Sequence, residues 1–580
     1  MNPIVEALLS QFIRTQELGS VDKSSAFEQL IAYCALSAER LDQGDFRDAL
    51  TDAGEEGLDA VAVLVNGTLV SDPSDIEELA TKFARLQVSY VFCQAKTGEK
   101  WDGGAVLKFT RAVGGFFDDT NIGSSSVVAT AREIHREVLG HIGQLDENPR
   151  ISAYYSTSGR WDPNSQAAKL LDELRQKLEA TAYFSGVRCE PIDAARIQHL
   201  YRSATAPPTA TVEFASKVTL PAINGVDQAY LGVLPAAELM KLLEDSEDRS
   251  LRRSVFEDNV RDFQGSSAPV NSRIRETLRG ADRERFAVLN NGITVVVRDL
   301  QVTGNAFRLR DYQVVNGAQT SNVLFENQDV LSSDANVFVP TRIIQTADED
   351  LITAIVTATN SQTVVPPEQL NARAVAERNV ERYFAASEPP RNLLYERRSK
   401  QYESTSDVIK SRVIDRLTLV RSVAAVVIDE PHLATGYPAQ LMSRLADARR
   451  QSEEGAGRVL FFGAEDEPIM YFAAAAAYYR LDVLFRTVRI DPKYKPARWH
   501  ILTVARHLVV PGPAPALDDS KPARTWPKPL LEKVWEDKAI DLFTQAKTLV
   551  EGTGLEISRP ALRNAAATAQ VLKAVQGEAF

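Results

Sequence analysis

With 580 residues, 44% of them hydrophobic and 25% charged, the chain has the composition of an ordinary soluble globular protein and is too long for one hydrophobic core. Its formal net charge of −12 excludes a protein that coats nucleic acid nonspecifically, because the phosphate backbone attracts lysine and arginine. The three cysteines are far apart in sequence and no apolar run approaches the roughly 20 residues of a membrane span, so we expect a cytoplasmic protein with no disulfide framework and no membrane partner.

The first segments of chemical interest are a helix and a strand. The helix is predicted over Ser24–Ile31, because a serine hydroxyl at its start can cap it and its apolar residues have helical spacing. Glu28 lies on this helix. The strand, Asp59–Val65, begins with a carboxylate and then runs almost wholly apolar, as a strand covered on both faces does. Asn66-Gly67 follows it, which is a strong two-residue hairpin signal.

A second buried strand is predicted over Gln87–Lys96. Because strand side chains alternate with period two, Gln94 and Lys96 share one face. A core strand needs neither of these polar groups. We therefore expect Asp59 to meet Gln94 and Lys96 at one end of a sheet.

This trio suits the hydrolysis of a phosphodiester. Such a reaction needs neutralisation of the phosphoryl oxygens and a positioned water, and Mg²⁺ or Mn²⁺ on hard oxygen ligands serves both needs. Asp59, the side-chain oxygen of Gln94 and the backbone carbonyl of Ala95 are the expected ligands. Lys96 would orient the water or stabilise developing charge. The alternative is that Asp59 caps a turn and the Lys96 stem extends along the strand end into solvent.

The order Glu28, then Gly57-Leu58-Asp59, then Gln94-Ala95-Lys96 resembles the PD-(D/E)xK nuclease superfamily, in its Mrr-like variant with a QxK motif. The resemblance implies a restriction-endonuclease-like mixed sheet with flanking helices over residues 1–203, and Mg²⁺-dependent endonuclease activity on nucleic acid. DNA is favoured over RNA as the partner, but the sequence leaves the choice between them open. A degenerate, inactive copy of the site is the alternative. Three other carboxylates compete with Glu28 for its place, namely Glu39, Glu55 and Glu56.

A first linker is expected over Ala204–Thr211, and the sequence changes character beyond it. Its blocks include Leu251–Gly265, Leu289–Val295, Tyr312–Ser321, Ala358–Gln362 and Leu394–Arg398. In this order they resemble the AIPR family, named for abortive-infection phage resistance. The resemblance covers about 212–435 and implies a central α+β domain and a role in bacterial antiphage defence.

A strand that runs into Asn316-Gly317-Ala318-Gln319-Thr320-Ser321 and then a helix predicts a strand–turn–helix whose free N–H groups favour an anion. Asn316, Gly317, Gln319 and Thr320 are therefore candidate contacts to a nucleotide or to a nucleic-acid phosphate. Asn290 and Asn291 are further candidates, with a tight turn before Gly292 as the alternative interpretation. No P-loop motif is present.

Arginines interleaved with aromatic residues suit a nucleic-acid surface, because guanidinium groups bind phosphate and aromatic rings stack on bases. The candidates are Arg261, Arg397 and Arg398. Intramolecular ion pairs, for example with Glu396, are an equally weighted alternative.

Residues 436–580 read as a helical region that packs on the middle domain or pairs two chains in a homo-oligomer. Helices are expected over Gln440–Arg450, Met470–Arg480, Leu484–Thr487, Arg498–Val509, Leu530–Leu549 and Arg559–Val575, with linkers at Pro511–Pro515 and Lys521–Pro529. The sequence as a whole predicts a multidomain α/β protein acting as a metal-dependent nuclease in antiphage defence. The alternatives are a nonhydrolytic nucleic-acid- or nucleotide-binding defence protein whose nuclease fold is inactive, and a protein–protein scaffold.

Overall fold

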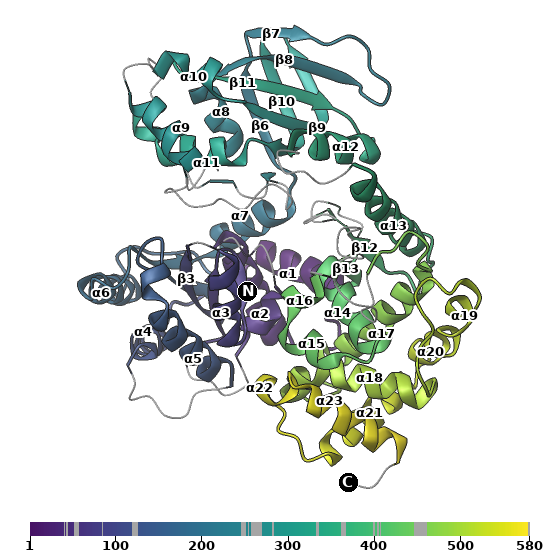
Figure 1. The fold of residues 1–580 in the computed structure, drawn as a ribbon. Coiled ribbons are helices and arrows are strands. Elements are labelled where there is room, and N and C mark those ends of the chain that lie inside the picture. Colours follow the sequence, from purple (N-terminus) through teal and green to yellow (C-terminus); the bar gives the residue numbers. More distant parts are fainter. Residues whose placement is uncertain are drawn as a thin grey trace.

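The computed structural model describes the chain except for residues 40, 42–43, 52–56, 84, 119–125, 245–250, 253–254, 257–268, 281–282, 332–335, 361–366, 398–400, 403–404, 406–407, 443, 446–460 and 578–580. It is a mixed α/β protein with two larger sheets and a helical region (Figure 1). The multidomain α/β class expected from the sequence is therefore confirmed.

The N-terminal sheet has five strands in the order β2-β1-β3-β4-β5. β1 is antiparallel to β2 and β3, whereas β4 and β5 run parallel to β3. The predicted hairpin is present, because Asn66 and Gly67 have φ of 50° and 79° and Val65 pairs with Thr68. The strands are β1 (Ala60–Val65), β2 (Thr68–Val70), β3 (Val88–Lys96), β4 (Arg150–Thr157) and β5 (Gly186–Ile192).

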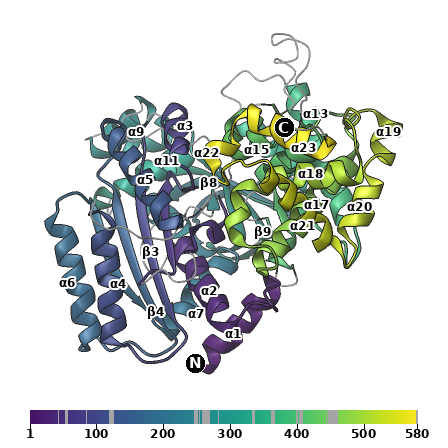
Figure 2. The same cartoon turned by 90° about the horizontal axis from the view of Figure 1, so that it is seen from below.

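Helices cover both faces of this sheet, which explains why β1 is buried at every position (Figure 2). One face packs against α1 (Pro3–Thr15), α2 (Lys23–Ala38) and α7 (Ala194–Thr205). The other packs against α3 (Ser74–Lys82), α4 (Gly103–Phe116), α5 (Ser126–Gly140) and α6 (Gln166–Ala180). Tyr90 and Phe92 belong to the second core, so the period-two alternation also places Gln94 on the α4 side of the sheet.

The second sheet has six strands in the order β6-β10-β9-β11-β8-β7. Four helices pack on one of its faces, and α12 (Glu349–Asn360) packs on the other through Ile352 and Val356. The expected linker Ala204–Thr211 is wrong at both ends: Ala204 and Thr205 close α7, and Thr209–Thr211 lie in β6 because they pair with β10. The strands are β6 (Thr209–Glu213), β7 (Ser216–Thr219), β8 (Gln228–Pro235), β9 (Ile293–Thr303), β10 (Ala306–Asn316) and β11 (Phe338–Gln345), and the four helices are α8 (Ala236–Leu243), α9 (Pro269–Arg279), α10 (Phe286–Leu289) and α11 (Ala318–Glu326).

The helical region has a single hydrophobic core that runs from Ala376 to Val571 and includes residues on both sides of the expected boundary after 435. Its elements are α13 (Pro367–Ala385), β12 (Leu394–Glu396), β13 (Val413–Asp415), α14 (Arg416–Val426), α15 (Pro431–Gly436), α16 (Pro438–Met442), α17 (Pro468–Arg486), α18 (Arg498–Val509), α19 (Ser520–Thr525), α20 (Lys528–Val534), α21 (Ala539–Gly552), α22 (Arg559–Leu562) and α23 (Ala565–Gln576).

Several helix boundaries differ from the prediction, among them that of the expected Arg559–Val575 helix, which is instead the pair α22 and α23. The two helices expected before residue 487 are one, α17, because Leu481, Leu484 and Phe485 stay buried and continue the apolar face. The helix expected over Leu530–Leu549 is instead the pair α20 and α21, separated by a turn in which Ala539 donates its N–H to the carbonyl of Glu536. Part of the expected linker Lys521–Pro529 is helical, as α19.

Candidate active site

Asp59 lies where β1 begins, directly beside the end of β3. Its backbone N–H donates to the carbonyl of Cys93 at 2.8 Å. Its carboxylate accepts the N–H of Ala95 through Oδ2 at 2.7 Å. The adjacent strand ends therefore hold this carboxylate against the last residues of β3, and the N–H of Ala95, with the carbonyl of the same residue, faces the Asp59 side.

The Gln94 side chain is buried, with 4% of its surface exposed, and its amide can be oriented in two ways. In one orientation Nε2 donates only to Asp59 Oδ1, at 3.4 Å. In the other, Nε2 donates to the Gly57 carbonyl at 2.8 Å and Oε1 accepts from Lys96 Nζ at 3.0 Å. The second orientation gives both polar atoms of this buried amide a hydrogen-bond partner. It also puts Oε1 at the position that Nε2 holds in the first orientation, about 3.4 Å from Asp59 Oδ1.

Lys96 is the last residue of β3 and is exposed, so the site opens to solvent at this position. Burial raises the pKa of Asp59, and the N–H of Ala95 and the charge of Lys96 oppose that rise. The structure thus brings Asp59, Gln94 and Lys96 together at one sheet end.

Glu28 approaches the same site from α2. Burial raises the pKa of its carboxyl, Asp59 raises it further, and Lys96 lowers it, so all three charges lie within electrostatic reach of one another. The competing Glu39 is engaged elsewhere, because it accepts hydrogen bonds from Tyr154 and from Arg188 Nη1, the latter at 3.1 Å. Two further competitors, Glu55 and Glu56, lie outside the described residues.

The sequence did not point to Tyr155 as a site residue. Tyr155 pairs with Gln94 across the parallel β3–β4 register, so both side chains lie on the same face. It is fully buried, and its hydroxyl is a polar atom without a hydrogen bond in the described structure. Burial and the nearby Asp102 and Asp59 raise its pKa to about 12, which keeps the proton on the hydroxyl and makes it a donor.

The donors at this site fit a hard divalent cation. They are one carboxylate, one amide oxygen and one backbone carbonyl, and Mg²⁺ commonly binds through one or two carboxylates while keeping several waters. Across the part of the chain that the structure describes, no three His, Cys, Asp or Glu side chains gather in a group that could hold a metal ion.

The expected strand–turn–helix of the central region is present. β10 ends at Asn316, Gly317 turns with φ of 95°, and α11 begins at Ala318. Only glycine fits at 317, because a Cβ there would lie 2.5 Å from Ile293 Cγ2. The Asn316 amide donates to the Thr359 carbonyl at 2.7 Å, so this turn meets the end of α12.

Asn290 joins the same turn. Its Oδ1 accepts the N–H of Gly292 at 2.8 Å and the hydroxyl of the buried Thr320 at 3.3 Å. The first bond is that of an Asx turn, which matches the tight-turn interpretation. Asn291 is exposed and Gln319 is half-buried. Three blocks that are distant in sequence therefore meet at the start of α11.

The interpretation of Arg397 as a surface contact to nucleic acid is wrong. Its side chain is 6% exposed and donates Nε to Glu381 Oε2 at 3.1 Å. Its backbone carbonyl also accepts from Arg416 Nη2 at 2.7 Å. A guanidinium already paired in the interior is not available to phosphate, so the ion-pair alternative holds, with Glu381 as partner. Arg261 and Arg398 lie outside the described residues.

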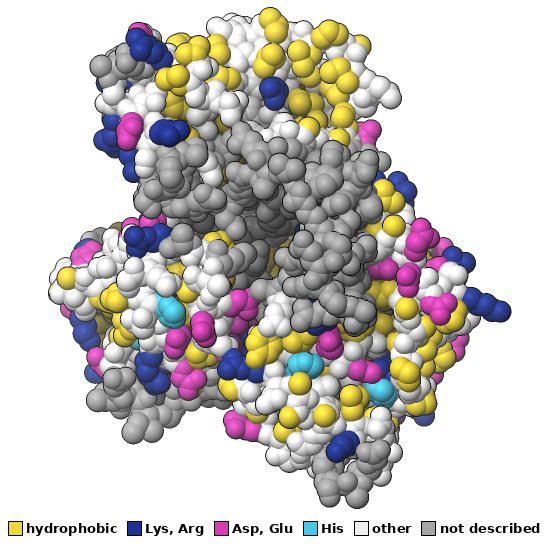
Figure 3. Space-filling model, in the orientation of Figure 1, with side chains coloured by type: hydrophobic (Ala, Val, Ile, Leu, Met, Phe, Trp, Pro, Cys, Tyr) yellow, Lys and Arg dark blue, Asp and Glu magenta, His cyan; other side chains and the backbone are white. Residues whose placement is uncertain are grey.

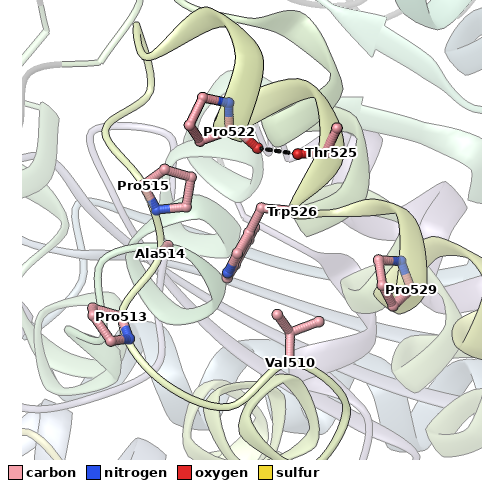
Figure 4. Close-up of a pocket in the computed structure, with 8 residues that line it drawn as sticks. All are labelled: Val510, Pro513, Ala514, Pro515, Pro522, Thr525, Trp526 and Pro529. Carbon is pink, nitrogen blue, oxygen red and sulfur yellow. Dashed lines mark hydrogen bonds between the residues drawn. The ribbon is translucent and has the colours of Figure 1, made fainter.

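Two other features of the described residues are the charges of one face and an apolar pocket. Basic and acidic side chains are interspersed over the described part of the face in Figure 3. A pocket in the helical region is lined by apolar groups around Trp526, with prolines such as Pro513 and Pro522 (Figure 4). Its lining has no titratable side chain, and it is separate from the Asp59 site.

The fold and the site define a multidomain α/β protein whose N-terminal sheet ends in a carboxylate, an amide and an ammonium group. The model of one family, described as AIPR protein, matches residues 256–551, just over half of the chain, and the chain belongs to this family. The match extends past the expected central region into the helical core. No curated protein and no solved structure gave a significant match. Within the described residues, no helix is both long and apolar enough to cross a membrane.

Proposed function

We propose that this AIPR protein is a metal-dependent nuclease and that its N-terminal sheet carries the active site. The observation that carries the proposal is the convergence of Asp59, Gln94 and Lys96 at the adjacent ends of β1 and β3. The topology supports it, since an antiparallel β1–β3 pair continued by parallel β4 and β5 is the order expected of a restriction-endonuclease-like fold.

A bound Mg²⁺ or Mn²⁺ supplies charge neutralisation at the phosphoryl oxygens. Asp59 and Gln94 would hold the ion with oxygen atoms, together with the carbonyl of Ala95. Lys96, at the open end of β3, orients the attacking water or stabilises charge on the scissile phosphate. The buried Tyr155 hydroxyl, which makes no hydrogen bond to a described residue, would donate to an oxygen of the bound phosphate once the site opens around it. Glu28, across the sheet end, adds negative charge that favours a cation.

Membership of the AIPR family associates the chain with antiphage abortive-infection defence. A nuclease in this setting would cleave nucleic acid, with DNA as the first substrate to examine. The net charge of −12 implies that binding relies on a local surface rather than on the field of the whole protein.

The decisive experiment incubates wild type and Lys96→Ala with plasmid, linear DNA and RNA, with Mg²⁺, Mn²⁺ or chelator. We expect cleavage by the wild type only with metal, and strongly reduced cleavage by the variant. Equal cleavage by both proteins would place the activity elsewhere or in a contaminant.

A nonhydrolytic binding protein is the second candidate. It is favoured by the meeting of Asn290, Asn316 and Thr320 at the start of α11, where a helix N-terminus offers N–H groups to an anion. Candidate nucleotides added to the purified protein should then raise its thermal midpoint, and Lys96→Ala should leave both this shift and nucleic-acid affinity unchanged.

A further inference from the structure

A short segment connects the candidate active site to the helical part of the AIPR region. In Figures 1 and 2 the N-terminal helices lie between the N-terminal sheet and the helices of that region. The segment Asp45–Thr51, which includes the 3₁₀ turn Phe46–Ala49, follows α2 and faces both sides. One of its ends contacts the Asp59 strand, and its charged residues contact α17 and α18.

The contacts to the Asp59 strand are hydrogen bonds to its backbone. The Thr51 N–H donates to the carbonyl of Asp59 at 3.1 Å, and the Thr51 hydroxyl donates to the carbonyl of Leu58 at 2.7 Å. Leu50 also forms an antiparallel bridge with Ala60. This segment therefore fixes the backbone from which the Asp59 carboxylate projects.

The contacts to the helical region are ion pairs with little exposure. Arg47 Nη1 lies 2.9 Å from Asp482 Oδ2 of α17, with 17% and 12% of the two side chains exposed. Asp48 Oδ1 lies 3.1 Å from Arg498 Nη2 of α18, with 20% and 16% exposed. Asp482 is in turn paired with Arg486 at 2.8 Å, so the helix side of the contact is itself held in place.

Electrostatics indicates that these pairs are tight. Burial by itself raises the pKa of Asp48, yet Arg498 and Lys495 hold it well below its usual range. The pKa of Asp482 is likewise lowered, to about 2, because Arg47 and Arg486 outweigh the effect of burial. Among the described residues, Arg47 without Asp482 would keep only Asp45 of its own segment as a partner, at 2.5 Å, and Asp48 without Arg498 would keep only the more distant Lys495, at 3.8 Å. The segment would then be held less firmly against α17 and α18.

We infer that the AIPR region positions the candidate nuclease site through this segment, so that catalysis depends on the Arg47–Asp482 and Asp48–Arg498 contacts. Arg47 and Asp48 are positioning residues, because they touch neither substrate nor metal. The inference rests on the proposed function for its effect on cleavage, but the mechanical link itself can be tested without activity. Any partner that pulls α17 and α18 away from the segment would loosen Asp59 and lower the rate.

The test uses the full chain with Asp482→Asn and Arg498→Gln. Hydrogen exchange of the Thr51 and Asp59–Val65 amides should accelerate about tenfold in both variants, since local opening becomes easier. Affinity for Mn²⁺ should weaken, and kcat should fall about 10- to 100-fold with little change in KM, because a small misplacement of a catalytic group is costly. Arg498→Lys, which keeps the charge, should restore most of each readout.

Arg563→Gln is the matched control. Arg563 follows α22 of the same helical core, beyond the family match, and contacts Asp72 of the N-terminal region at 3.9 Å, but that contact leads to α3 and not to Asp59. It should leave exchange at Thr51 and Asp59 unchanged. Unchanged exchange in Asp482→Asn and Arg498→Gln, or an equal increase in Arg563→Gln, would overturn the inference. If the wild type cleaves nothing with either metal, the proposed function fails and the exchange data alone decide the link.

Discussion

Replacing Asp59 by Asn separates the chemistry of the site from the stability of the fold. The Asn side chain keeps an oxygen that can accept the Ala95 N–H now bound at 2.7 Å, so the strand ends should remain aligned. What is lost is the negative charge next to the cation. Such a charge contributes several kcal/mol to transition-state stabilisation. A loss of about 4 kcal/mol corresponds to a rate about 10³-fold lower.

The stability of Asp59→Asn should not fall. Burial raises the pKa of Asp59, which means that the folded protein disfavours the ionised form, and Asn carries no charge to desolvate. The assay pairs cleavage kinetics at saturating Mg²⁺ with thermal unfolding in chelator. Asp75→Asn is the matched control, since Asp75 is also a half-buried carboxylate with a raised pKa but lies on α3. If Asp59→Asn cleaves at the wild-type rate, or if Asp59→Asn and Asp75→Asn lose equal amounts of cleavage rate, Asp59 does not hold the cation.

Four further outcomes are expected. Lys96→Met should reduce kcat about 10²- to 10³-fold, because Lys96 acts on developing charge, and should lower stability by only about 1–3 kcal/mol, because the buried Gln94 oxygen loses its donor; an effect on binding alone would contradict this role. Tyr155→Phe should lower kcat about tenfold at unchanged Mn²⁺ affinity, as measured by titration calorimetry, because only one hydrogen bond to the phosphate is lost. The pKa values of Asp59 and Glu28 are raised, so their ionised forms, which favour a cation, appear only above the ordinary carboxylate pKa of about 4, and the Mn²⁺-induced rise in Tm should grow with pH. In chelator, the two carboxyl groups should instead lose their contribution to stability as the pH rises through their raised pKa values. This loss should be larger in wild type than in Asp59→Asn. Arg397→Ala should destabilise the protein by about 1–3 kcal/mol in denaturant unfolding because the half-buried Glu381 loses its charged partner and keeps, among the described residues, only the hydrogen bond from Gln401, whereas a surface phosphate contact would cost almost nothing.

Local patterns sufficed for the strand pair that carries the site. The apolar run after Asp59, the Asn66-Gly67 turn and the period-two alternation up to Lys96 each depend on neighbouring residues, and the structure has all three features. Membership of the AIPR family was likewise expected from the order of short blocks in the middle of the chain.

Features that depend on long-range pairing could not be read in this way. Tyr155 reaches the site only through the parallel register of β4 against β3, and no local pattern specifies that register. Arg397 looked like a surface residue because the aromatic and basic residues around it suit nucleic acid, but α13 supplies the buried partner Glu381. The pair Arg47–Asp482 joins residues 435 positions apart, and ion pairs of this kind carry no periodic signal.

The proposed function requires that a divalent cation bind between Asp59 and Gln94. Crystals of the full chain grown with Mn²⁺ and measured at the manganese absorption edge test it directly. We expect an anomalous peak about 2.1 Å from an oxygen of each of these side chains, and its loss in crystals of Asp59→Asn. If the protein cleaves nucleic acid but the anomalous peak lies elsewhere, or persists in Asp59→Asn, the cation does not bind at the proposed site.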